Sequence, residues 1–453
     1  MDRTTLRNTK QEVSLSLNSD FDALKSSPSF EVPDSSVFKK KVLSFSRRYE
    51  RVCILDNNYP TEHSGQEYIA AFDGTVELKL NAEKGGFASL KEFCDNYKDD
   101  WKFGYLTYDL KNDNEDLSSD NPDKLSFPSL HFFVPGILLY LSNERIYIKS
   151  EGHNEAELFD EISKQALEID EPSTEVNLKD ELIVSPDRSH YIETIRRLKD
   201  EIVQGNIYEI NYCRELSGNC VIDPYRSFGA MNDLSRAPFS CFYKVSDAFL
   251  LCSSPERFLK KSGNEIISQP IKGTRRRSED KNEDEVLKKQ LIDDVKERAE
   301  NVMIVDLVRN DLSHTAERGS VEVLELFGIH SFPHVHQMIS TVQSNLKKHV
   351  HFVDAIRHCF PMGSMTGAPK LRAMELIEKH EHFKRGIFSG SVGFITPGQN
   401  FDFNVVIRSI LYNRYSDFVS IRTGSAITDM CNAEDEWSEC ELKAKVLLSC
   451  LKR

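Results

Sequence analysis

Two pairs of glutamates, far apart in the sequence, have a spacing that could bind a metal ion. Glu297 and Glu300 lie three residues apart in KERAENVMIVDLVRNDL, and Glu436 and Glu439 repeat this spacing in DEWSECELKAK. On a helix, residues three apart share one face. If the two helices meet, four carboxylates share one pocket, and a cation or protons must relieve their repulsion. Mg2+ would suit such a site because it prefers oxygen ligands and keeps positions open for an anionic substrate, although either pair alone is typical of a solvated helix face.

Other residues could hold an anionic substrate. The loop GSMTGAPK at 363–370 opens a predicted helix, with Pro369 suited to the first turn and Thr366 able to supply a hydroxyl at its start. Free backbone N–H groups there could bind a carboxylate, although a plain capped helix start fits the spacing equally well. Arg408 in FNVVIRS and Lys443, four residues after a glutamate, could complete a clamp for a dicarboxylate. The alternative for both is a surface side chain whose charged end reaches solvent.

One lysine is a candidate nucleophile. Lys272 precedes a glycine in PIKGT, and a partly desolvated lysine can attack an electrophile as the neutral amine. Burial and nearby cations would lower its pKa, whereas carboxylates would raise it. On sequence alone, a loop lysine that begins the basic run KGTRRR is the favoured interpretation. His330, His334 and His336 lack a fourth ligand at zinc-site spacing, so we expect them to line a strand edge or a substrate cleft.

The composition excludes several classes of function. The chain has 453 residues and a formal net charge of −14, which argues against nucleic acid and anionic membranes as partners. The longest apolar runs fall short of the roughly 20 residues of a membrane span. The polar first residues do not resemble a secretory signal, and the ten cysteines form no C-x-x-C. We therefore expect a cytoplasmic protein with free thiols.

The hydrophobic pattern predicts a mixed fold. A helix capped at Asp34-Ser35-Ser36 would place Phe38, Val42, Phe45 and Tyr49 on one stripe. Helices and strands alternate irregularly and are joined by hairpins, which favours an α+β fold over a doubly wound parallel sheet. Residues 170–180 are polar and have the composition of a linker. We therefore divide the chain into an N-terminal region, 1–175, and a catalytic region, 176–453, both woven into one fold.

Seven motifs in order give the chain a family resemblance: GNIYEIN, SSPERFL, QPIKGTR, KERAENVMIVDLVRNDL, PMGSMTGAPKLRAMELI, FDFNVVIRS and the closing EWSE. Together they resemble the chorismate-utilising enzymes, the anthranilate synthase component I family. The resemblance is dense from Gly205 to Lys443 and weaker before it, where VCILDNN and FGYLTYDL match the N-terminal part. It covers nearly the whole chain.

The resemblance implies β-sheets packed face to face with helices outside. It also implies Mg2+ between the two glutamate pairs, bridging to the ring carboxylate of chorismate. Lys443 and the backbone of Gly424, Ser425 and Ala426 would hold the same carboxylate, and Arg408 would hold the enolpyruvyl carboxylate. The remaining pocket positions that it implies are Thr274 and Ser364, beside Thr366 of the loop described above.

Four positions bear on the reaction within this family. Glu209 stands where isochorismate and salicylate synthases carry a lysine base, which disfavours addition of water. Lys272 replaces the alanine of anthranilate synthases and is similar to the lysine of the aminodeoxychorismate-forming members. There it attacks C2 as the 4-hydroxyl leaves, and ammonia then enters at C4. Gln337 replaces a histidine that helps pyruvate elimination, which leaves the proton donor to the hydroxyl unassigned, and Phe388 replaces a tyrosine.

Three hypotheses for function follow. The first is amination of chorismate at C4, with ammonia from a glutamine amidotransferase subunit, because the chain lacks the G-x-C-x-G motif of a glutaminase. The second is formation of anthranilate with release of pyruvate. The third is an inactive scaffold that activates a glutaminase; retention of the four glutamates, Lys272 and Arg408 argues against it.

Overall fold

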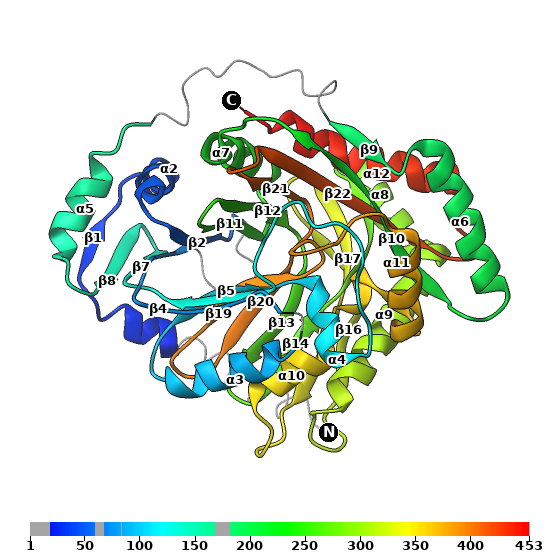
Figure 1. The fold of residues 1–453 in the computed structure, drawn as a ribbon, viewed down its shortest axis with the longest axis horizontal. Helices are drawn as coiled ribbons and strands as arrows, with labels where there is room; N and C mark the ends of the chain where they lie inside the picture. The colour runs from blue at the N-terminus through cyan, green and yellow to red at the C-terminus, as the bar shows by residue number, and fades with distance from the viewer. Residues whose placement is uncertain (1–18, 59–67, 83, 168–181, 453) are drawn as a thin grey trace.

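Two antiparallel β-sheets form the centre of the molecule, and helices cover the outside (Figure 1). The computed structural model describes residues 19–58, 68–82, 84–167 and 182–452. The predicted linker and the boundary at 175 lie outside the described residues. Helices combined with antiparallel sheets correspond to the α+β class that the sequence predicts.

The first sheet has 12 strands within the described residues. Its strands run, in spatial order, β1 (Ser29–Glu31), β8 (Arg145–Ser150), β7 (Ile137–Ser142), β3 (Tyr68–Phe72), β2 (Arg51–Asp56), β11 (Phe239–Val245), β12 (Ala248–Ser254), β21 (Ser409–Asn413), β22 (Phe418–Ile427), β10 (Glu209–Asn219) and β18 (Gly367–Ala368), with β9 (Ile183–Ser185) paired to β10.

The second sheet has ten strands within the same residues. Their order is β15 (Ile271–Arg276), β17 (Val335–Asn345), β14 (Glu265–Gln269), β13 (Arg257–Ser262), β20 (Phe401–Val405), β19 (Ser391–Ile395), β5 (Lys102–Leu106), β6 (Leu130–Val134) and β4 (Val76–Leu80), with β16 (Glu322–Ser331) paired to β17.

Strands from both parts of the sequence share both sheets. In the first sheet, β2 pairs with β11, with Asp56 opposite Ser240. In the second, β5 pairs with β19, with Leu106 opposite Ser391. The two regions that the sequence separates are therefore joined by continuous ladders of backbone hydrogen bonds.

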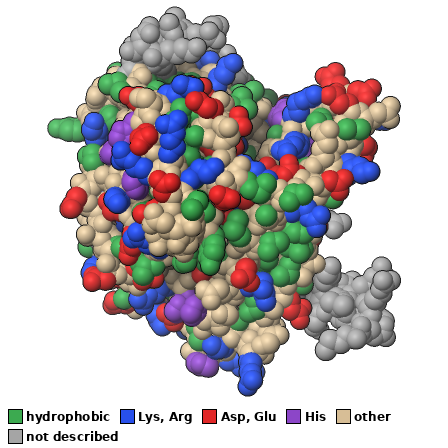
Figure 2. All heavy atoms as spheres, turned by 90° about the vertical axis from the view of Figure 1, so that its right-hand side faces the viewer, with side chains coloured by type: hydrophobic (Ala, Val, Ile, Leu, Met, Phe, Trp, Pro, Cys, Tyr) green, Lys and Arg blue, Asp and Glu red, His purple; other side chains and the backbone are tan. Residues whose placement is uncertain are grey.

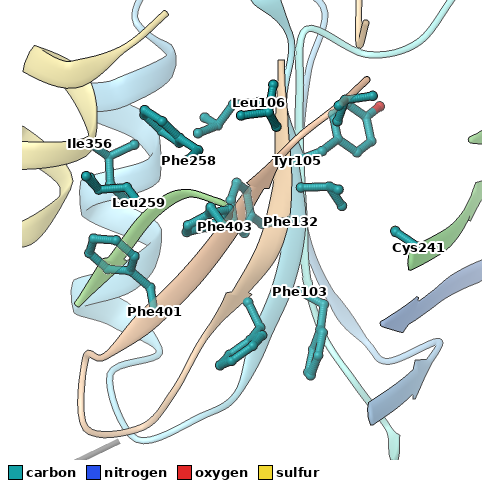
Figure 3. Close-up of a cluster of buried hydrophobic side chains, with 14 of the residues drawn as sticks. Phe103, Tyr105, Leu106, Phe132, Cys241, Phe258, Leu259, Ile356, Phe401 and Phe403 are labelled. Carbon is teal, nitrogen blue, oxygen red and sulfur yellow. The ribbon is translucent and has the colours of Figure 1, made fainter. Parts of the chain in front are cut away.

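The side chains of β2 show how the layers form. Val52 and Ile54 face a hydrophobic cluster on the helix-covered side of the first sheet. Cys53 and Leu55 alternate with them and face the core between the two sheets. Aromatic residues fill part of that inter-sheet core: the rings of Tyr105 on the second sheet and Tyr243 on the first meet edge to face, 5.1 Å apart. Figure 3 shows Phe103 and Tyr105 on the side of the second sheet that faces Cys241 of the first.

The helices cover the outer faces and the ends of the sheets. They are α2 (Ser35–Phe45), α3 (Gly86–Asn96), α4 (Lys111–Asn114), α5 (Glu155–Ser163), α6 (Arg188–Val203), α7 (Pro224–Ser235), α8 (Lys281–Asp293), α9 (Val295–Ser313), α10 (Phe352–Cys359), α11 (Lys370–His380) and α12 (Ala433–Ser449). In the described part of the chain, none of them combines the length and the apolar character that crossing a membrane requires.

The first of these helices begins as its sequence predicts but ends early. Asp34 caps α2 by accepting a hydrogen bond of 3.0 Å from the backbone N–H of Val37, and Phe38, Val42 and Phe45 are buried. The helix ends at Phe45, so Tyr49 lies beyond it, after a short 3-10 turn.

The GSMTGAPK segment differs from its prediction. Residues Gly367–Ala368 form β18, which pairs with β10, and α11 begins only at Lys370 with no side-chain cap. The Thr366 hydroxyl therefore does not start the helix. It is fully buried and donates instead to the carbonyls of Met362 and Gly363.

Charged side chains of both signs are interspersed with hydrophobic ones on the face that carries α6 (Figure 2). That face presents no continuous basic surface.

Candidate active site

A cavity of about 630 Å3 opens where β15 of one sheet approaches β10 and β22 of the other, beside α9 and α12. Its volume lies in the range usual for small-molecule sites. Every predicted site residue except Thr366 lines it: Lys272, Thr274, Glu297, Glu300, Ser364, Arg408, Gly424, Ser425, Ala426, Glu436, Glu439 and Lys443. The structure thus gathers into one cavity residues that lie more than 170 positions apart in the sequence.

Capping residues fix where the two helices that carry the glutamate pairs begin. Asp294 caps α9 by accepting a hydrogen bond from the backbone N–H of Glu297, which lies in the first turn. Asn432 caps α12 in the same way, through the N–H groups of Glu434 and Asp435. Both helices therefore begin at the cavity and direct their glutamates into it.

Each of the four glutamates pairs with a basic side chain. Arg275 lies 3.6 Å from Glu297, and Lys443 lies 2.6 Å from Glu439. Lys296 contacts Glu436 at 3.1 Å and Glu300 at 3.8 Å. Among the described residues, no three acidic, histidine or cysteine side chains stand close enough to bind a metal ion as they are placed.

The chemistry of these donors nevertheless fits a hard cation. Glu300 Oε1 is buried and accepts no hydrogen bond. Burial raises the pKa of Glu300 to about 7, and burial also raises the pKa of Glu297. Carboxylates that are costly to keep charged, with an oxygen left unsatisfied, are what a bound divalent ion would stabilise.

The candidate nucleophile is paired inside the cavity. Lys272 Nζ, which is buried, donates a hydrogen bond to Glu209 Oε1 and lies 4.0 Å from Glu300. Burial disfavours the ammonium form, but the two carboxylates outweigh it, so the pKa of Lys272 is raised. Lys272 is therefore protonated at rest, with a proton acceptor already in contact.

Glu256 is a functional candidate that the sequence analysis did not single out. It is buried, lines the cavity and accepts a hydrogen bond of 2.7 Å from the hydroxyl of Ser364. Burial raises the pKa of Glu256 to about 7, so it can be protonated near neutrality. The sequence feature that could have indicated Glu256 is the motif SSPERFL, in which this acidic residue follows Pro255 between two apolar strands.

The predicted anion-binding residues occupy one wall. Arg408 lies in the left-handed region, with φ of 52°, in the short link between β20 and β21, and burial lowers its pKa. Lys443 donates a hydrogen bond of 2.8 Å to the carbonyl of Gly424. The Ser425 hydroxyl contacts the Tyr191 hydroxyl of α6 at 3.0 Å, so Ser425 offers the cavity mainly its backbone.

The other predictions have mixed outcomes. Gln337 and Phe388 line the cavity, as does Asn211, which sequence reasoning missed. The histidines do not line it: His330 pairs with Glu325 on β16, and buried His336 contacts Asp284 and Ser331. They lie on or beside strands of the second sheet, so the strand-edge alternative describes them better than the substrate cleft.

Comparison with known proteins identifies the family. Residues 50–449 match the chorismate binding enzymes. The aminodeoxychorismate synthase component 1 of Escherichia coli is 32% identical over 352 residues, covering 77% of this chain and 76% of that protein. The anthranilate synthase component 1 of Thermus thermophilus is 31% identical over 352 residues, covering 76% of each. The chain therefore belongs to the chorismate binding enzyme family.

A third relative matches over a shorter stretch. The aminodeoxychorismate synthase component 1 of Klebsiella aerogenes is 40% identical over 223 residues, which is 49% of this chain and 49% of that protein.

A solved structure confirms the fold. Anthranilate synthase component I from Streptococcus pneumoniae superimposes with a TM-score of 0.71, covering 86% of this chain and 95% of that one at 21% identity. The mixed α+β architecture that the sequence predicted, with face-to-face sheets and outer helices, is thus the architecture of a known fold.

Proposed function

We propose that this chain aminates chorismate at C4, as component I of an aminodeoxychorismate synthase on the route to p-aminobenzoate and folate. The observation that carries the proposal is the buried Lys272 on the cavity wall, in contact with Glu209. Two relatives at 32% and 40% identity bear that name, which supports the same activity.

The reaction begins with a proton transfer. Lys272 can attack only as the neutral amine, and Glu209 is placed to take its proton. The amine then forms a bond to C2 of chorismate, the ring double bonds shift, and the bond between C4 and its hydroxyl breaks. Ammonia subsequently forms a bond to C4, the double bonds shift back, and Lys272 leaves C2 as the amine.

Glu256 supplies the proton that the departing hydroxyl needs. Hydroxide is a poor leaving group, whereas water leaves readily, so a general acid must act at C4. Because burial raises the pKa of Glu256 to about 7, the acid form is available at neutral pH. Ser364, whose hydroxyl donates to Glu256, fixes the direction of this carboxyl. This assigns the proton donor that the replacement of histidine by Gln337 left open.

Chorismate is held through its two carboxylates. Lys443 and the backbone of Gly424, Ser425 and Ala426 would bind the ring carboxylate, and Arg408 would bind the enolpyruvyl carboxylate. Glu297, Glu300, Glu436 and Glu439 would hold Mg2+, which when bound would draw negative charge from the ring carboxylate. The unsatisfied oxygen of buried Glu300 supports this ligand set.

We infer that ammonia comes from a glutamine amidotransferase subunit. The word "component" in the names of the relatives implies a multisubunit enzyme, and the present chain has no glutaminase motif. All ten cysteines are free and buried, which suits a cytoplasmic protein. Burial of a thiol disfavours its ionised, reactive form.

A second candidate is formation of anthranilate, favoured by the 31% identity to the Thermus thermophilus enzyme. The two reactions differ in whether pyruvate leaves the product. Lys272 and Gln337 in the cavity favour a product that keeps its enolpyruvyl group. An inactive scaffold is the third candidate, and it would be favoured by a calorimetric titration with Mg2+ present in which chorismate does not bind.

The deciding experiment identifies the product. The purified chain is incubated with chorismate, Mg2+ and ammonium at mildly alkaline pH, and products are separated and weighed by mass spectrometry. A product with nitrogen at C4 and an intact enolpyruvyl ether is expected. Anthranilate with free pyruvate would contradict the proposal and establish the second candidate.

A further inference from the structure

Lys296 lies between the two glutamate pairs and contacts both helices. It is in the first turn of α9, and its Nζ lies 3.1 Å from Glu436 Oε1 on α12. The same Nζ lies 3.8 Å from Glu300 Oε1, one turn further along α9. Lys296 therefore joins one glutamate of each helix at the point where the proposed Mg2+ site would lie.

The fit of the ammonium is incomplete on one side. The distance to Glu300 exceeds that of a hydrogen bond, and Glu300 Oε1 is left without a donor. The contact with Glu436, by contrast, is within hydrogen-bond distance. A single positive charge thus offsets two carboxylates but satisfies only one of them, which leaves a position better suited to a smaller, doubly charged ion.

Lys296 is also more exposed to solvent than the two carboxylates that it contacts. About one third of its side chain is exposed, at 34%, whereas the side chains of Glu300 and Glu436 are only 7% and 4% exposed. A lysine ammonium is strongly hydrated and stands on a flexible four-carbon stem. It can therefore leave the carboxylates for solvent without any change in the backbone of α9.

We propose that Lys296 is an internal counter-ion that occupies the cation position between α9 and α12 and is displaced when the divalent ion binds. This rests on the proposed Mg2+ site. Two cations a few ångströms apart repel strongly in a partly buried site, so the metal and the ammonium compete for the same carboxylates. Lys296 thereby weakens metal binding while it prevents the buried carboxylates from repelling one another when no metal is present.

The test measures metal binding directly, without chorismate. Mn2+ replaces Mg2+ as the probe because both prefer oxygen ligands, and free Mn2+ is followed by its electron paramagnetic resonance signal. Three variants are compared with the natural chain: Lys296→Met, which keeps the apolar stem, Lys296→Arg, which keeps the charge, and Lys445→Met. Lys445 is an exposed residue of α12, and its variant controls for the loss of one positive charge.

Competition predicts that Lys296→Met binds Mn2+ at least about fivefold more tightly than the natural chain. Lys296→Arg and Lys445→Met should remain within about twofold of it. In thermal denaturation without metal, Lys296→Met should melt at a lower temperature, and added Mn2+ should raise its melting temperature more than that of the natural chain.

The outcomes separate this inference from the function on which it rests. Equal or weaker Mn2+ binding by Lys296→Met, with saturable binding by the natural chain, would overturn the counter-ion proposal and leave the metal site standing. If none of the four chains bound Mn2+ saturably, both the counter-ion proposal and the proposed metal site would be overturned. The product assay is scored separately, so amination of chorismate is judged on its own result.

Discussion

The hydroxyl of Ser364 donates a hydrogen bond of 2.7 Å to the buried carboxyl of Glu256. This contact joins the 3-10 turn Gly363–Met365 to the junction between β12 and β13. It stabilises the ionised form of Glu256, but burial outweighs it and raises the pKa of Glu256 to about 7. The pair therefore sets the pH at which the cavity contains an acid.

Replacing Glu256 should remove that acid. Glu256→Gln keeps the shape and can still accept from Ser364, but it cannot protonate the departing hydroxyl. The rate constant of amination should fall by about 100-fold or more, because general acid catalysis contributes roughly 10²–10⁴. Steady-state kinetics measures the effect, with KM for chorismate nearly unchanged. A variant with the activity of the natural chain would mean that another group donates the proton.

The pH dependence should follow the Glu256 carboxyl. The acid form is populated below its pKa of about 7, so turnover that requires this acid should decline as pH rises through that value. In Ser364→Ala, loss of the donated hydrogen bond disfavours the carboxylate and raises the pKa of Glu256 further. The alkaline limb of the pH–rate profile should therefore move to higher pH. A limb that stays in place, or moves to lower pH, would contradict the assignment.

Removing the amine of Lys272 should abolish the covalent route. Lys272→Ala should slow amination by orders of magnitude, because ammonia would then have to displace the 4-hydroxyl unaided. Lys272→Gln is the matched variant: its amide can still donate to Glu209, so a folding defect is smaller. Mass spectrometry of the natural chain, quenched with chorismate in the absence of ammonium, should detect the adduct on Lys272. Near-normal turnover by both variants would exclude the covalent mechanism.

We expect the Glu300 carboxylate to destabilise the metal-free fold and to be required for metal binding. Burial raises its pKa to about 7 in the folded chain, above the roughly 4.3 of an exposed glutamate. A raised carboxyl pKa means that folding favours the protonated form, so this group stabilises the fold less as pH rises from about 4.3 through 7.

Glu300→Gln, which carries no charge, should therefore raise the melting temperature of the metal-free chain at pH 8 while it abolishes the response of activity to Mg2+. The comparison at pH 5, where Glu300 is mostly protonated, is the control and should show little difference in melting temperature. Unchanged activity and Mg2+ response would mean that the four-carboxylate ligand set is wrong.

Local sequence signals predicted the elements that carry the site. Both glutamate pairs lie on helices that begin at capping residues, as expected because three-residue spacing and capping depend on neighbours in the chain. The sequence predicted that both pairs face one cavity only on the condition that the two helices meet, and the structure meets this condition. The helix start predicted at Asp34-Ser35-Ser36 was confirmed for the same reason, and the structure shows Asp34 as its cap.

Contacts between distant segments could not be predicted in this way. Thr366 was expected at a helix start, but pairing of β18 with Glu209 and Ile210 of β10 draws the preceding residues into the interior. Glu256 was missed because its value as an acid comes from burial beneath segments about 100 residues away. The position of Lys296 depends on how close α9 and α12 come, which the sequence of neither helix contains.

The ladders between β2 and β11 and between β5 and β19 bear on how such a chain can change during evolution. Removing the N-terminal region would leave β11 and β19 as open edges, each with a row of unpaired backbone groups that invites association with other chains. Loss of either region alone would thus expose an aggregation-prone edge. We therefore expect the strands that carry the cavity to require the N-terminal strands as pairing partners.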